Sequence, residues 1–575
     1  MTGTANATDA TDATDATDAT ETLAVPVLIV GAGPVGLTAA RLLANAGRRC
    51  LVVERRDGPQ RNPAAHVVNA RTLEIFRQAG FDMEAIGAIA KDPADAGHVN
   101  FVTRLGGELI GRLPFERQGE ECLAHTPTPL RNISQHRLEP LLAEQVAPFV
   151  DLRYDTEWSS ATQDADGVTS VLRDRVTGEE TTVRSAYLLG ADGAGSGVRK
   201  WLGIPMLGPA SIQSFVAIHA EADLRPYVAN RLGVLHFVLD PEAQGTFIAH
   251  DLDREWVFMV AYDPETESLD DFDAARCAAL VTAAIGDPAA TVDVVGAGTW
   301  HMSAQVAEHL CEGRTFLVGD AAHRFPPTGG MGLNTGVADA HNLVWKLCAV
   351  DDGWASPPLL DTYETERRPV AETNCHQSAT NAYKIVHLHE ALGVRPGATS
   401  KDLAAVLADP ARRDAIDVAV AEQATHFDML GLQLGYVYAD GALARDGEPP
   451  GAVEDPSTFV PSAEVGARLP HVWLTDGRST LDLVSTAGLT LLTGGAHDAW
   501  AETLAGIGTS DGLAPIHQVR LGEDATVGPD WHALAAVGDD GALLIRPDQH
   551  VAWRADTLPA DPTTALTGAL ETVLG

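Results

Sequence analysis

Two glycine-rich segments, far apart in the chain, most strongly limit how this 575-residue sequence can fold. The first, Gly31 to Gly36 (GAGPVG), follows an apolar run over 25–30 and opens a helical pattern over 37–46. In a strand–turn–helix phosphate site, the first glycine permits the turn, the second lets the backbone approach a pyrophosphate, and the third lets helix and strand pack closely. The segment therefore predicts dinucleotide binding by a Rossmann-like α/β domain.

A second predicted strand, over 49–53, ends in Glu54. An acid about twenty residues after the glycines accepts hydrogen bonds from the ribose hydroxyls of NAD or FAD. Glycines after a strand also form ordinary turns, but the strand, the helix and the spaced acid together favour a cofactor site. The expected cofactor contacts in this part of the chain are Gly31, Gly33, Pro34, Gly36, Glu54 and the adjacent Arg55.

The second glycine-rich segment distinguishes FAD from NAD. Residues 314–320 (RTFLVGD) form a predicted buried strand, and its terminal Asp320 is placed to accept from a sugar or ribitol hydroxyl. A stretch rich in Pro and Gly follows, and a helix predicted over 335–349 begins directly after it. The N-terminus of such a helix stabilises the electron-rich edge of a reduced flavin. The two segments together predict FAD, and the alternative for the second is a simple loop-to-helix turn.

With a third segment, Tyr187 to Arg199 (YLLGADGAGSGVR), the chain resembles the class A flavoprotein aromatic hydroxylases, which share the p-hydroxybenzoate hydroxylase fold. The resemblance extends from about residue 24 to the end. It implies that Asp192 lies near the pyrophosphate, a position associated with FAD and NAD(P)H, although Asp192 and Gly193 alone also form a good strand-to-helix turn. It implies further FAD contacts by Arg71, Gln135, Pro327, Gly330, Gly332, Leu333 and Asn334.

Within this family the chain looks like the larger members with a C-terminal thioredoxin-like domain, such as phenol and chlorophenol monooxygenases and aromatic polyketide hydroxylases. Residues 466–474, 479–484 and 543–553 carry this likeness. No cysteine follows Cys375, so the last domain cannot perform thiol–disulfide chemistry. The expected organisation is a disordered tail over 1–22, a discontinuous FAD-binding domain over 23–204 and 301–390, an inserted substrate-binding β-sheet domain over 205–300, a helical connection over 391–455, and the thioredoxin-like domain over 456–575.

Short β-prone runs separated by turn residues fill the inserted segment. In the run 255–262 both alternating sets of side chains are apolar, which predicts a strand covered on both faces. We expect a helix layer on one face and, on the other, the flavin with an apolar pocket for an aromatic ring. The alternative is that these aromatic residues simply form core.

Composition excludes several classes of partner. A formal net charge of -39 disfavours nucleic acid and anionic membranes, because both would be repelled. The six cysteines are scattered without a CxxC motif, which argues against structural zinc and suits a reducing cytoplasm. No apolar run approaches the length of a membrane span. The Thr-Asp-Ala repeat over 8–20 is typical of a disordered tail. A monomer and a homodimer both remain open.

The resemblance implies an FAD-dependent monooxygenase that consumes NAD(P)H and O2. It would hydroxylate a phenolic or polycyclic aromatic substrate through a flavin C4a-hydroperoxide. Because a phenol reacts better as phenolate, a base or hydrogen-bond acceptor should assist. His66 is the candidate, since its loop follows the Glu54 strand and in the family approaches the flavin; ordering of that loop is its alternative role. Asn69 and His323 are weaker candidates, and His323 fits better as a support of its own loop.

Other outcomes stay open at this point. There is no second GxGxxG segment, so NADH or NADPH is expected to be used transiently, without a domain of its own. The same oxygen chemistry could instead perform a Baeyer–Villiger oxidation or inactivate an antibiotic. A flavin-binding protein without turnover is a third possibility. A plain NAD-dependent dehydrogenase is disfavoured, because it leaves Asp192 and Asp320 unexplained.

Overall fold

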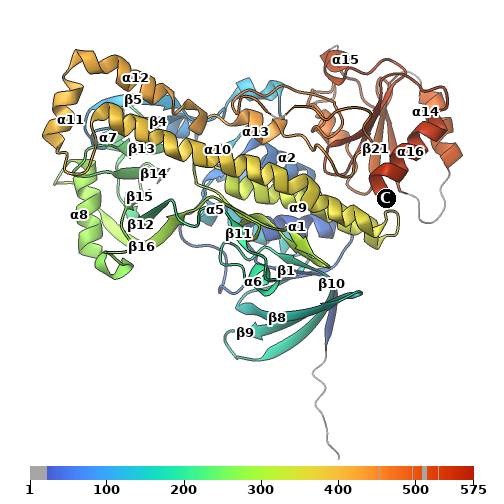
Figure 1. The fold of residues 1–575 in the computed structure, drawn as a ribbon, viewed down its shortest axis with the longest axis horizontal. Coiled ribbons are helices and arrows are strands. Elements are labelled where there is room, and N and C mark those ends of the chain that lie inside the picture. The colour runs from blue at the N-terminus through green and yellow to red at the C-terminus, as the bar shows by residue number, and fades with distance from the viewer. Residues whose placement is uncertain (1–21, 452, 495–496, 508–513, 529) are drawn as a thin grey trace, which may run out of the picture.

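The computed structural model describes residues 22–575, except 452, 495–496, 508–513 and 529. The N-terminal repeat, for which we expected a disordered tail, lies outside the described residues. Figure 1 shows three parts: a large mixed sheet with its helices, a second sheet, and a C-terminal domain at the opposite end from that second sheet. The long helix α10 (Thr362–Leu392) runs across the molecule and links them.

The first sheet is built on parallel strands. Its main path has the order β18-β19-β10-β1-β2-β7, with β1 (Leu23–Val30) parallel to both β10 (Glu180–Gly190) and β2 (Cys50–Val53). The hairpin of β8 and β9 extends from β10. The remaining strands of this sheet are β7 (Asp151–Arg153), β8 (Thr156–Asp164), β9 (Gly167–Asp174), β18 (Cys311–Glu312) and β19 (Thr315–Leu317). Parallel pairing brings the carboxyl ends of β1, β2, β10 and β19 to one edge.

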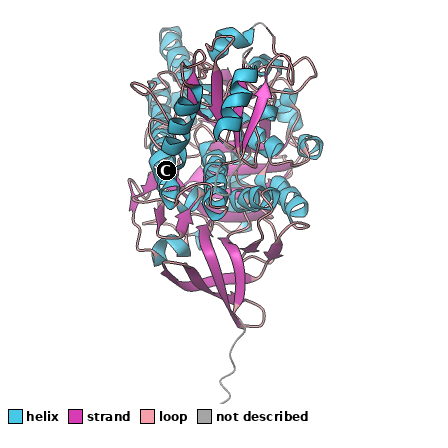
Figure 2. Cartoon of the chain, turned by 90° about the vertical axis from the view of Figure 1, so that its right-hand side faces the viewer, coloured by secondary structure: helices cyan, strands magenta, loops and turns pink. Residues whose placement is uncertain are grey.

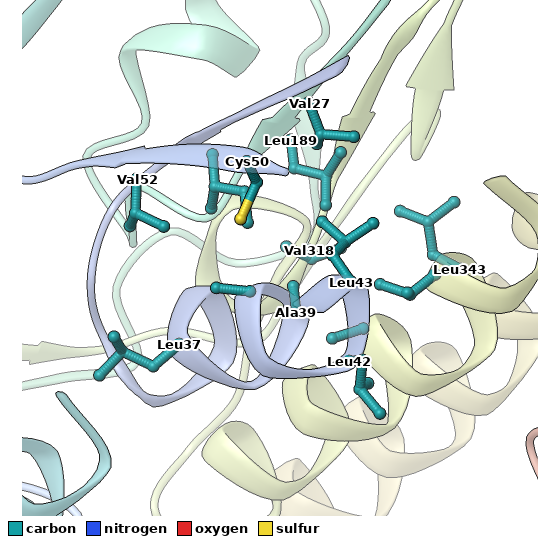
Figure 3. Packing of buried hydrophobic residues seen from close by; sticks show 14 of the residues in the cluster. Val27, Leu37, Ala39, Leu42, Leu43, Cys50, Val52, Leu189, Val318 and Leu343 are labelled. Carbon is teal, nitrogen blue, oxygen red and sulfur yellow. The ribbon is translucent and has the colours of Figure 1, made fainter. Parts of the chain in front are cut away.

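Apolar helix faces cover this sheet. In Figure 3, Leu37, Ala39 and Leu43 of α1 (Pro34–Asn45) lie beneath strand residues, and Leu43 is next to Leu343 of α9 (Met331–Asp351). These side chains are almost completely buried. Helix α9 is buried along nearly its whole length, so it is a central element rather than a surface helix. Other elements of this part are β3 (Val67–Val68), α2 (Ala70–Gln78), α3 (Met83–Ala88), α4 (Pro93–Ala96), β6 (Arg131–Asn132), α5 (Gln135–Val146) and α6 (Gly197–Trp201).

The second sheet has seven strands in the order β16-β12-β15-β14-β13-β4-β5. Two of them, β4 (His98–Val102) and β5 (Leu109–Pro114), come from the part of the chain expected to belong to the FAD-binding domain. They join this sheet because β4 pairs parallel with β13 and buries four of its five residues. The other strands are β12 (Gln213–Glu221), β13 (Leu235–Val238), β14 (Gly245–Asp251), β15 (Glu255–Ala261) and β16 (Asp293–Met302).

Different layers cover the two faces of this sheet. Helix α8 (Ala274–Ile285) packs on the face that carries Trp256 and Phe258. On the opposite face, Phe101 and Phe237 pack against the helical segment that follows α10. The same face continues over β12, β15 and β16 with half-buried Phe215, Met259 and Trp300. The strand over 255–261 is therefore covered on one face by α8, whereas part of the other face keeps solvent access.

Short elements connect the two sheets to the C-terminal domain. A small three-stranded sheet has the order β11-β17-β20. Its strands and the other short elements are β11 (Met206–Leu207), α7 (Arg225–Val228), β17 (Gln305–Ala307), β20 (His323–Arg324), α11 (Ser400–Leu407), α12 (Arg413–Ala421) and α13 (Leu430–Gly435). The segment expected as a helical connection thus holds three α-helices within its described residues.

The C-terminal domain is a separate four-stranded sheet with the order β22-β21-β23-β24. Strands β21 and β22 are parallel, while β23 and β24 run antiparallel to their neighbours, which is the arrangement expected of a thioredoxin-like domain. Figure 2 views the molecule from this side, with helices flanking the strands. The elements are β21 (Leu489–Thr493), α14 (His497–Ile507), β22 (Ile516–Arg520), α15 (Asp530–Ala535), β23 (Ala542–Ile545), β24 (Val551–Ala555) and α16 (Pro562–Leu574).

The position of β10 in the middle of the first sheet gives a stability prediction. Leu188 is 0% exposed and pairs with Leu28 of β1 and Thr315 of β19. Leu188→Ala should destabilise this part of the protein by about 2–5 kcal/mol, because a cavity replaces packed side-chain atoms. Val176→Ala, at a position 76% exposed, should change stability by less than about 0.5 kcal/mol. Denaturant unfolding followed by circular dichroism checks both, and equal effects would contradict the assignment of β10 to the core.

Candidate active site

The three sequence motifs meet at the carboxyl edge of the first sheet. The amide of Ala191 donates to Val30 (2.8 Å), and the amide of Gly31 donates to Val53 (2.8 Å), so the ends of three neighbouring strands are held together. Gly31 has φ +108, and a Cβ there would clash with the carbonyl of Ala191. A Cβ on Gly36 would clash with the carbonyl of Gly31. These two glycines are therefore required by the protein's own packing.

Gly33 differs from its two neighbouring glycines. A Cβ at Gly33 would meet no protein atom within 4 Å, and its φ of -74 suits any residue. It is the N-cap of α1, where no described side chain caps the helix and Pro34 occupies the first turn. The free N–H groups and the positive end of the helix dipole thus face open space. This geometry fits a pyrophosphate, as the sequence predicted.

Glu54 lies at the end of β2 and is held by the turn beside it. Its carboxylate accepts from the amide of Ala32 (3.0 Å) and from the amide and Nε of Arg56 (3.0 Å each). Burial acts to raise the pKa of Glu54, but the hydrogen bonds from Arg56 and Ala32 hold it below its ordinary value. Glu54 is therefore an ionised acceptor. Arg55, which the sequence placed with it, is exposed, so Arg56 is the arginine that pairs with Glu54.

Gln135 reaches the same region from α5. Its side-chain amide donates to Glu139 (3.1 Å), which also accepts from Arg56 (2.8 Å). Its backbone amide donates to Ala65 (2.8 Å). Gln135 thus joins the Glu54 turn to the loop that carries His66. The roles of Arg56 and Glu139 were missed by the sequence analysis, because they depend on a contact between residues far apart in the chain.

Asp192 has two roles in the structure. One carboxylate oxygen accepts from the amides of Gly197 (2.7 Å) and Val198 (3.1 Å), so Asp192 caps α6 as an ordinary turn residue does. The other oxygen is buried and has no hydrogen-bond partner among the described residues. A buried acceptor without a partner is costly, so this oxygen fits a donor supplied by a ligand.

Asp320 stands over the first turn of α9. A Cβ on Gly332 would lie 3.9 Å from Oδ1 of Asp320. The residue is exposed to solvent, and desolvation by the protein around it raises the pKa of its carboxyl. The α9 N-terminus has no described side-chain cap, and Gly332 and Leu333 in its first turn are half-buried. An acceptor and free helix donors therefore face the same space, which suits the ribityl chain and ring edge of a flavin.

The turn before α9 is fixed by Asn334. The amide of Gly330 donates to Pro327 (3.0 Å), and the Asn334 side chain donates to the carbonyl of Gly330 (2.6 Å). Asn334 also accepts from the amide of Asn69 (2.9 Å), whose own side chain caps α2. Asn69, a weaker catalytic candidate, is thus engaged in holding two segments of the site together. Helix α9 begins at Met331, four residues before the predicted start, because this turn is stabilised by tertiary contacts.

The buried carboxylate of Asp339 holds the backbone on either side of Asp320. Asp339 of α9 accepts from the amide of Gly319 (3.1 Å), from Nε2 of His323 (2.7 Å) and from Nε of Arg367 (2.8 Å). Burial acts to raise the pKa of Asp339, but His323 and Arg367 hold it below its usual range. The completely buried His323 therefore supports its loop, which is the role favoured for it from sequence.

Arg71 is held by buried protein partners. Its guanidinium donates to Gln549 (2.6 Å), to Glu74 (3.0 Å) and to the carbonyl of Asp548 (2.8 Å), and only 2% of the residue is exposed. These partners belong to α2 and the C-terminal domain. These contacts place Arg71 in the interface between two domains, and the FAD contact that the resemblance implies for it stays a prediction. A salt-bridged arginine in a sequence motif gives no local signal of which partner it will meet.

His66 has a defined orientation and protonation state. The Gln118 side-chain amide donates to the carbonyls of Ala96 (3.2 Å) and Phe115 (2.9 Å), so its oxygen accepts from Asn132 (2.9 Å). The Asn132 oxygen therefore faces His66, and Nδ1–H of His66 donates to it (3.0 Å). Desolvation lowers the pKa of His66 to about 4, so the ring is neutral, and its Nε2 is an acceptor to which none of the described residues donates.

Comparisons with known proteins agree with this arrangement. A family model described as "FAD binding domain" matches residues 24–378, and one described as "Aromatic-ring hydroxylase, C-terminal" matches residues 462–575. The 2,4-dichlorophenol 6-monooxygenase of Cupriavidus pinatubonensis is 34% identical, over 96% of this chain and 97% of the relative. The tetracenomycin B2 monooxygenase-dioxygenase of Streptomyces olivaceus is also 34% identical, over 96% and 99%. The solved structure of the flavin-dependent monooxygenase PieE, with FAD and substrate, matches with a TM-score of 0.89 at 35% identity, over 96% and 99% of the two chains.

The chain belongs to the FAD-dependent aromatic-ring hydroxylases. The α/β fold class, the family and the FAD cofactor expected from sequence are confirmed. The hydroxylase is thus a monooxygenase of aromatic substrates, and the open acceptors and helix termini above are the parts of this chain that fit its cofactor. In the described residues no helix is long and apolar enough to cross a membrane, and no group of three or more potential metal ligands occurs.

The different surroundings of Gly33 and Gly36 give a paired prediction for the hydroxylase. Gly33→Ala should leave the stability of the FAD-free protein within about 0.5 kcal/mol, because its Cβ meets no protein atom. The added methyl should weaken FAD binding at least about tenfold, since it enters the space in front of the helix N-terminus. Gly36→Ala should lower both stability and affinity. Fluorescence titration with FAD and thermal melting check this, and wild-type affinity in Gly33→Ala would contradict the assignment.

Proposed function

We propose that the substrate of this hydroxylase is a phenol or a polycyclic aromatic compound that carries a ring hydroxyl, and that NADH or NADPH supplies the electrons. The observation that carries the proposal is the neutral His66 ring, whose Nε2 is left free as an acceptor by the fixed Nδ1–H. The printed names of the relatives support it, because one is a dichlorophenol monooxygenase and another acts on tetracenomycin B2.

The apolar surface for the substrate ring is proposed to be the half-buried face of the second sheet. Phe215 and Trp300 are cross-strand partners on this face, with ring centroids 5.8 Å apart, and Met259 lies beside them. Aromatic and methionine side chains contribute large apolar contact areas and adapt to flat ligands. A face of this kind suits one ring or several fused rings.

The chain's own residues would hold the cofactor and exclude water from it. When bound, FAD takes electrons from reduced nicotinamide and transfers one atom of O2 to the substrate. We assign Glu54 to the ribose, Gly33 to the pyrophosphate, and Asp192 and Asp320 to hydroxyl or amide donors of the cofactor. The α9 N-terminus stabilises negative charge on the ring edge. Asn334 constrains the turn over 326–332 by donating to the carbonyl of Gly330, so we assign this turn to holding the ring edge.

His66 is proposed to polarise the substrate hydroxyl as a hydrogen-bond acceptor. A phenol has a pKa of about 10, like tyrosine, so full transfer of its proton to a group of pKa about 4 is uphill by about 8 kcal/mol. A hydrogen bond from the hydroxyl to Nε2 avoids this cost and still shifts electron density into the ring. The proton is best shared between the substrate hydroxyl oxygen and Nε2 of His66 until the ring carbon has reacted.

The proposal also covers the compartment, the partners and the oligomeric state of the enzyme. All six cysteines are free thiols, which suits a reducing compartment such as the cytoplasm. The strong negative charge favours a small molecule over nucleic acid or an anionic membrane as partner. We propose a cytoplasmic enzyme that acts as a monomer or a homodimer, which light scattering of the purified protein would distinguish.

The direct test follows NADH and NADPH oxidation under air with FAD-loaded protein and a panel of phenols and polycyclic aromatics. The proposal expects oxidation stimulated by one aromatic class, with one oxygen atom added to the ring. Oxygen inserted next to a ketone would instead indicate a Baeyer–Villiger reaction, and modification of an antibiotic would indicate inactivation. Bound flavin without stimulation by any aromatic compound would point to a role without turnover.

The role of His66 gives a second test. His66→Ala should retain FAD binding but reduce the rate of hydroxylation by about 10²-fold relative to NAD(P)H oxidation, the magnitude typical of one positioned acid–base group. Product formed per NAD(P)H consumed measures this ratio. Asn132→Leu is the matched variant: it leaves the imidazole in place but frees Nδ1, so a smaller loss is expected. Unchanged coupling in His66→Ala would exclude the acceptor role.

The lowered pKa of His66 also predicts a pH profile. Because the folded protein lowers this pKa to about 4, the ring stays neutral from pH 8 down to about pH 6, and its acceptor is lost only as the pH approaches 4. Wild-type coupling should therefore show no step near the ordinary histidine pKa of about 6.5. A step there that disappears in His66→Ala would show that the ring titrates normally.

A further inference from the structure

Buried ion pairs join the C-terminal domain to the helices behind the cofactor site. Both terminal nitrogens of Arg546 donate to the carboxylate of Glu366 in α10 at 2.7 Å, and Lys346 of α9 donates to the same carboxylate at 2.8 Å. Asp548 completes the cluster by pairing with Arg546. The side chains of Arg546, Glu366 and Lys346 are 0% exposed. The residues come from three separate parts of the chain.

A second buried cluster ties the C-terminal domain to α2. Arg468 donates to both oxygens of Glu74, at 2.8 and 3.0 Å, and Arg71 donates to Glu74 and to Gln549. The side chains of Arg468 and Glu74 are each 1% exposed. The two clusters are therefore both enclosed by protein, and each crosses the same domain boundary.

Buried ion pairs contribute little net stability to a fold. Taking charges out of water costs several kcal/mol for each ion, and apolar side chains of similar volume often serve stability as well or better. Their advantage is geometric, because the paired forks of arginine and carboxylate accept only one relative placement. Burial acts to raise the pKa of Glu366, but Arg546 and Lys346 lower it to about 2, so the carboxylate stays ionised. The cluster thus fixes the position of the C-terminal domain against α9 and α10.

Each cluster leads directly to a cofactor segment. Arg367, the neighbour of Glu366, donates to Asp339, and Asp339 in turn accepts from the backbone amide of Gly319 and from His323. Arg367 also donates to the hydroxyl of Tyr438 (3.3 Å), and the Tyr438 ring shares an apolar cluster with Leu469 and Val551 of the C-terminal domain.

The second cluster leads to the other side of the same site. Glu74 and Arg71 belong to α2, whose first residues are held through Asn69 and Thr72 to the side chain of Asn334. Asn334 fixes the turn before α9. The C-terminal domain therefore touches, through two short chains of contacts, the Asp320 segment and the Asn334 turn.

We propose that the C-terminal domain, which contains no cysteine, is a positioning element for FAD, and that Arg546 is the positioning residue of its larger cluster. The domain holds α10 and α2 so that Asp339 and Asn334 keep the Gly319 segment and the α9 turn in the geometry that binds the cofactor. This inference rests on FAD binding by the family, and it does not depend on which aromatic compound is the substrate.

Two variants of Arg546 test the proposal, with one control in the same domain. Arg546→Met removes the charge at similar volume, and Arg546→Lys keeps the charge but loses the paired donors. The control is Leu543→Ala: Leu543 lies on β23, three positions before Arg546, and shares an apolar cluster with Leu492 and Trp531, whereas the described α9 residues Trp345 and Ala349 belong to a different cluster. Its loss should cost about 2–5 kcal/mol of stability without touching either cluster.

FAD affinity and the visible circular dichroism of bound FAD are measured well below every melting temperature. Arg546→Met should weaken FAD binding about tenfold or more and change the flavin bands, with Arg546→Lys intermediate, in the usual range of coupling between two sites. Leu543→Ala should lower the melting temperature comparably, yet keep the FAD dissociation constant within about twofold and the bands unchanged.

Two results would overturn the proposal. One is wild-type FAD affinity and wild-type flavin bands in Arg546→Met. The other is a loss of affinity in Leu543→Ala as large as in Arg546→Met, which would show that general destabilisation is the cause. If Arg546→Met does not fold, Arg546→Lys and Glu366→Gln decide by the same two readouts. Aromatic substrate is not used, so failure here and failure of the proposed hydroxylation are separate results.

Discussion

The parallel hydrogen bonding of β10 to β1 on one side and to β19 on the other is the constraint on which the site depends. It places the ends of strands from three distant parts of the sequence side by side, so that the turn at Gly31, the cap at Asp192 and the acceptor at Asp320 surround one space. A change in register of one strand would separate them, because each motif follows its strand directly. Clashes that a Cβ would cause at Gly31 and Gly36 show how closely helix and strands approach here.

The same edge also explains which motif residues could be assigned from sequence. Glycines and a strand-terminal acid reflect local geometry, so spacing and position at a strand end were enough to predict cofactor contacts for Gly33, Glu54 and Asp320. The roles of Arg56, Asp339 and Arg367 were not predicted, because they arise from tertiary partners that no local pattern specifies. The protein partners of Arg71 were missed for the same reason. The resemblance predicts an FAD contact for it, but Gln549 and Asp548, with which it bonds in the structure, lie far along the chain.

Fold prediction has the same limit. The α/β class followed from the strand–turn–helix patterns at the two glycine-rich segments and from the resemblance, which also implied a thioredoxin-like last domain. The membership of β4 and β5 in the second sheet did not, since a strand carries information about its buried faces but little about which neighbour it will pair with. Buried ionised residues at the domain boundary are harder still to predict, because charged residues are mostly exposed and are expected at the surface when only the sequence is known.

Burial and a neighbouring cation both lower the pKa of His66. Desolvation removes basicity from the imidazole, and the nearby Lys91 ammonium lowers its pKa further. The same positive field acts on any acid placed beside it, and it favours the anion of a phenol over the neutral form. Lys91 itself is held at a pKa of about 8 by desolvation, so it remains mostly charged at neutral pH. Because Lys91 lowers the pKa values of the imidazole and of a neighbouring phenol alike, and desolvation lowers that of the imidazole further, the gap between the two pKa values stays wide. His66 is therefore suited to the acceptor role proposed for it, and not to full removal of a phenol proton.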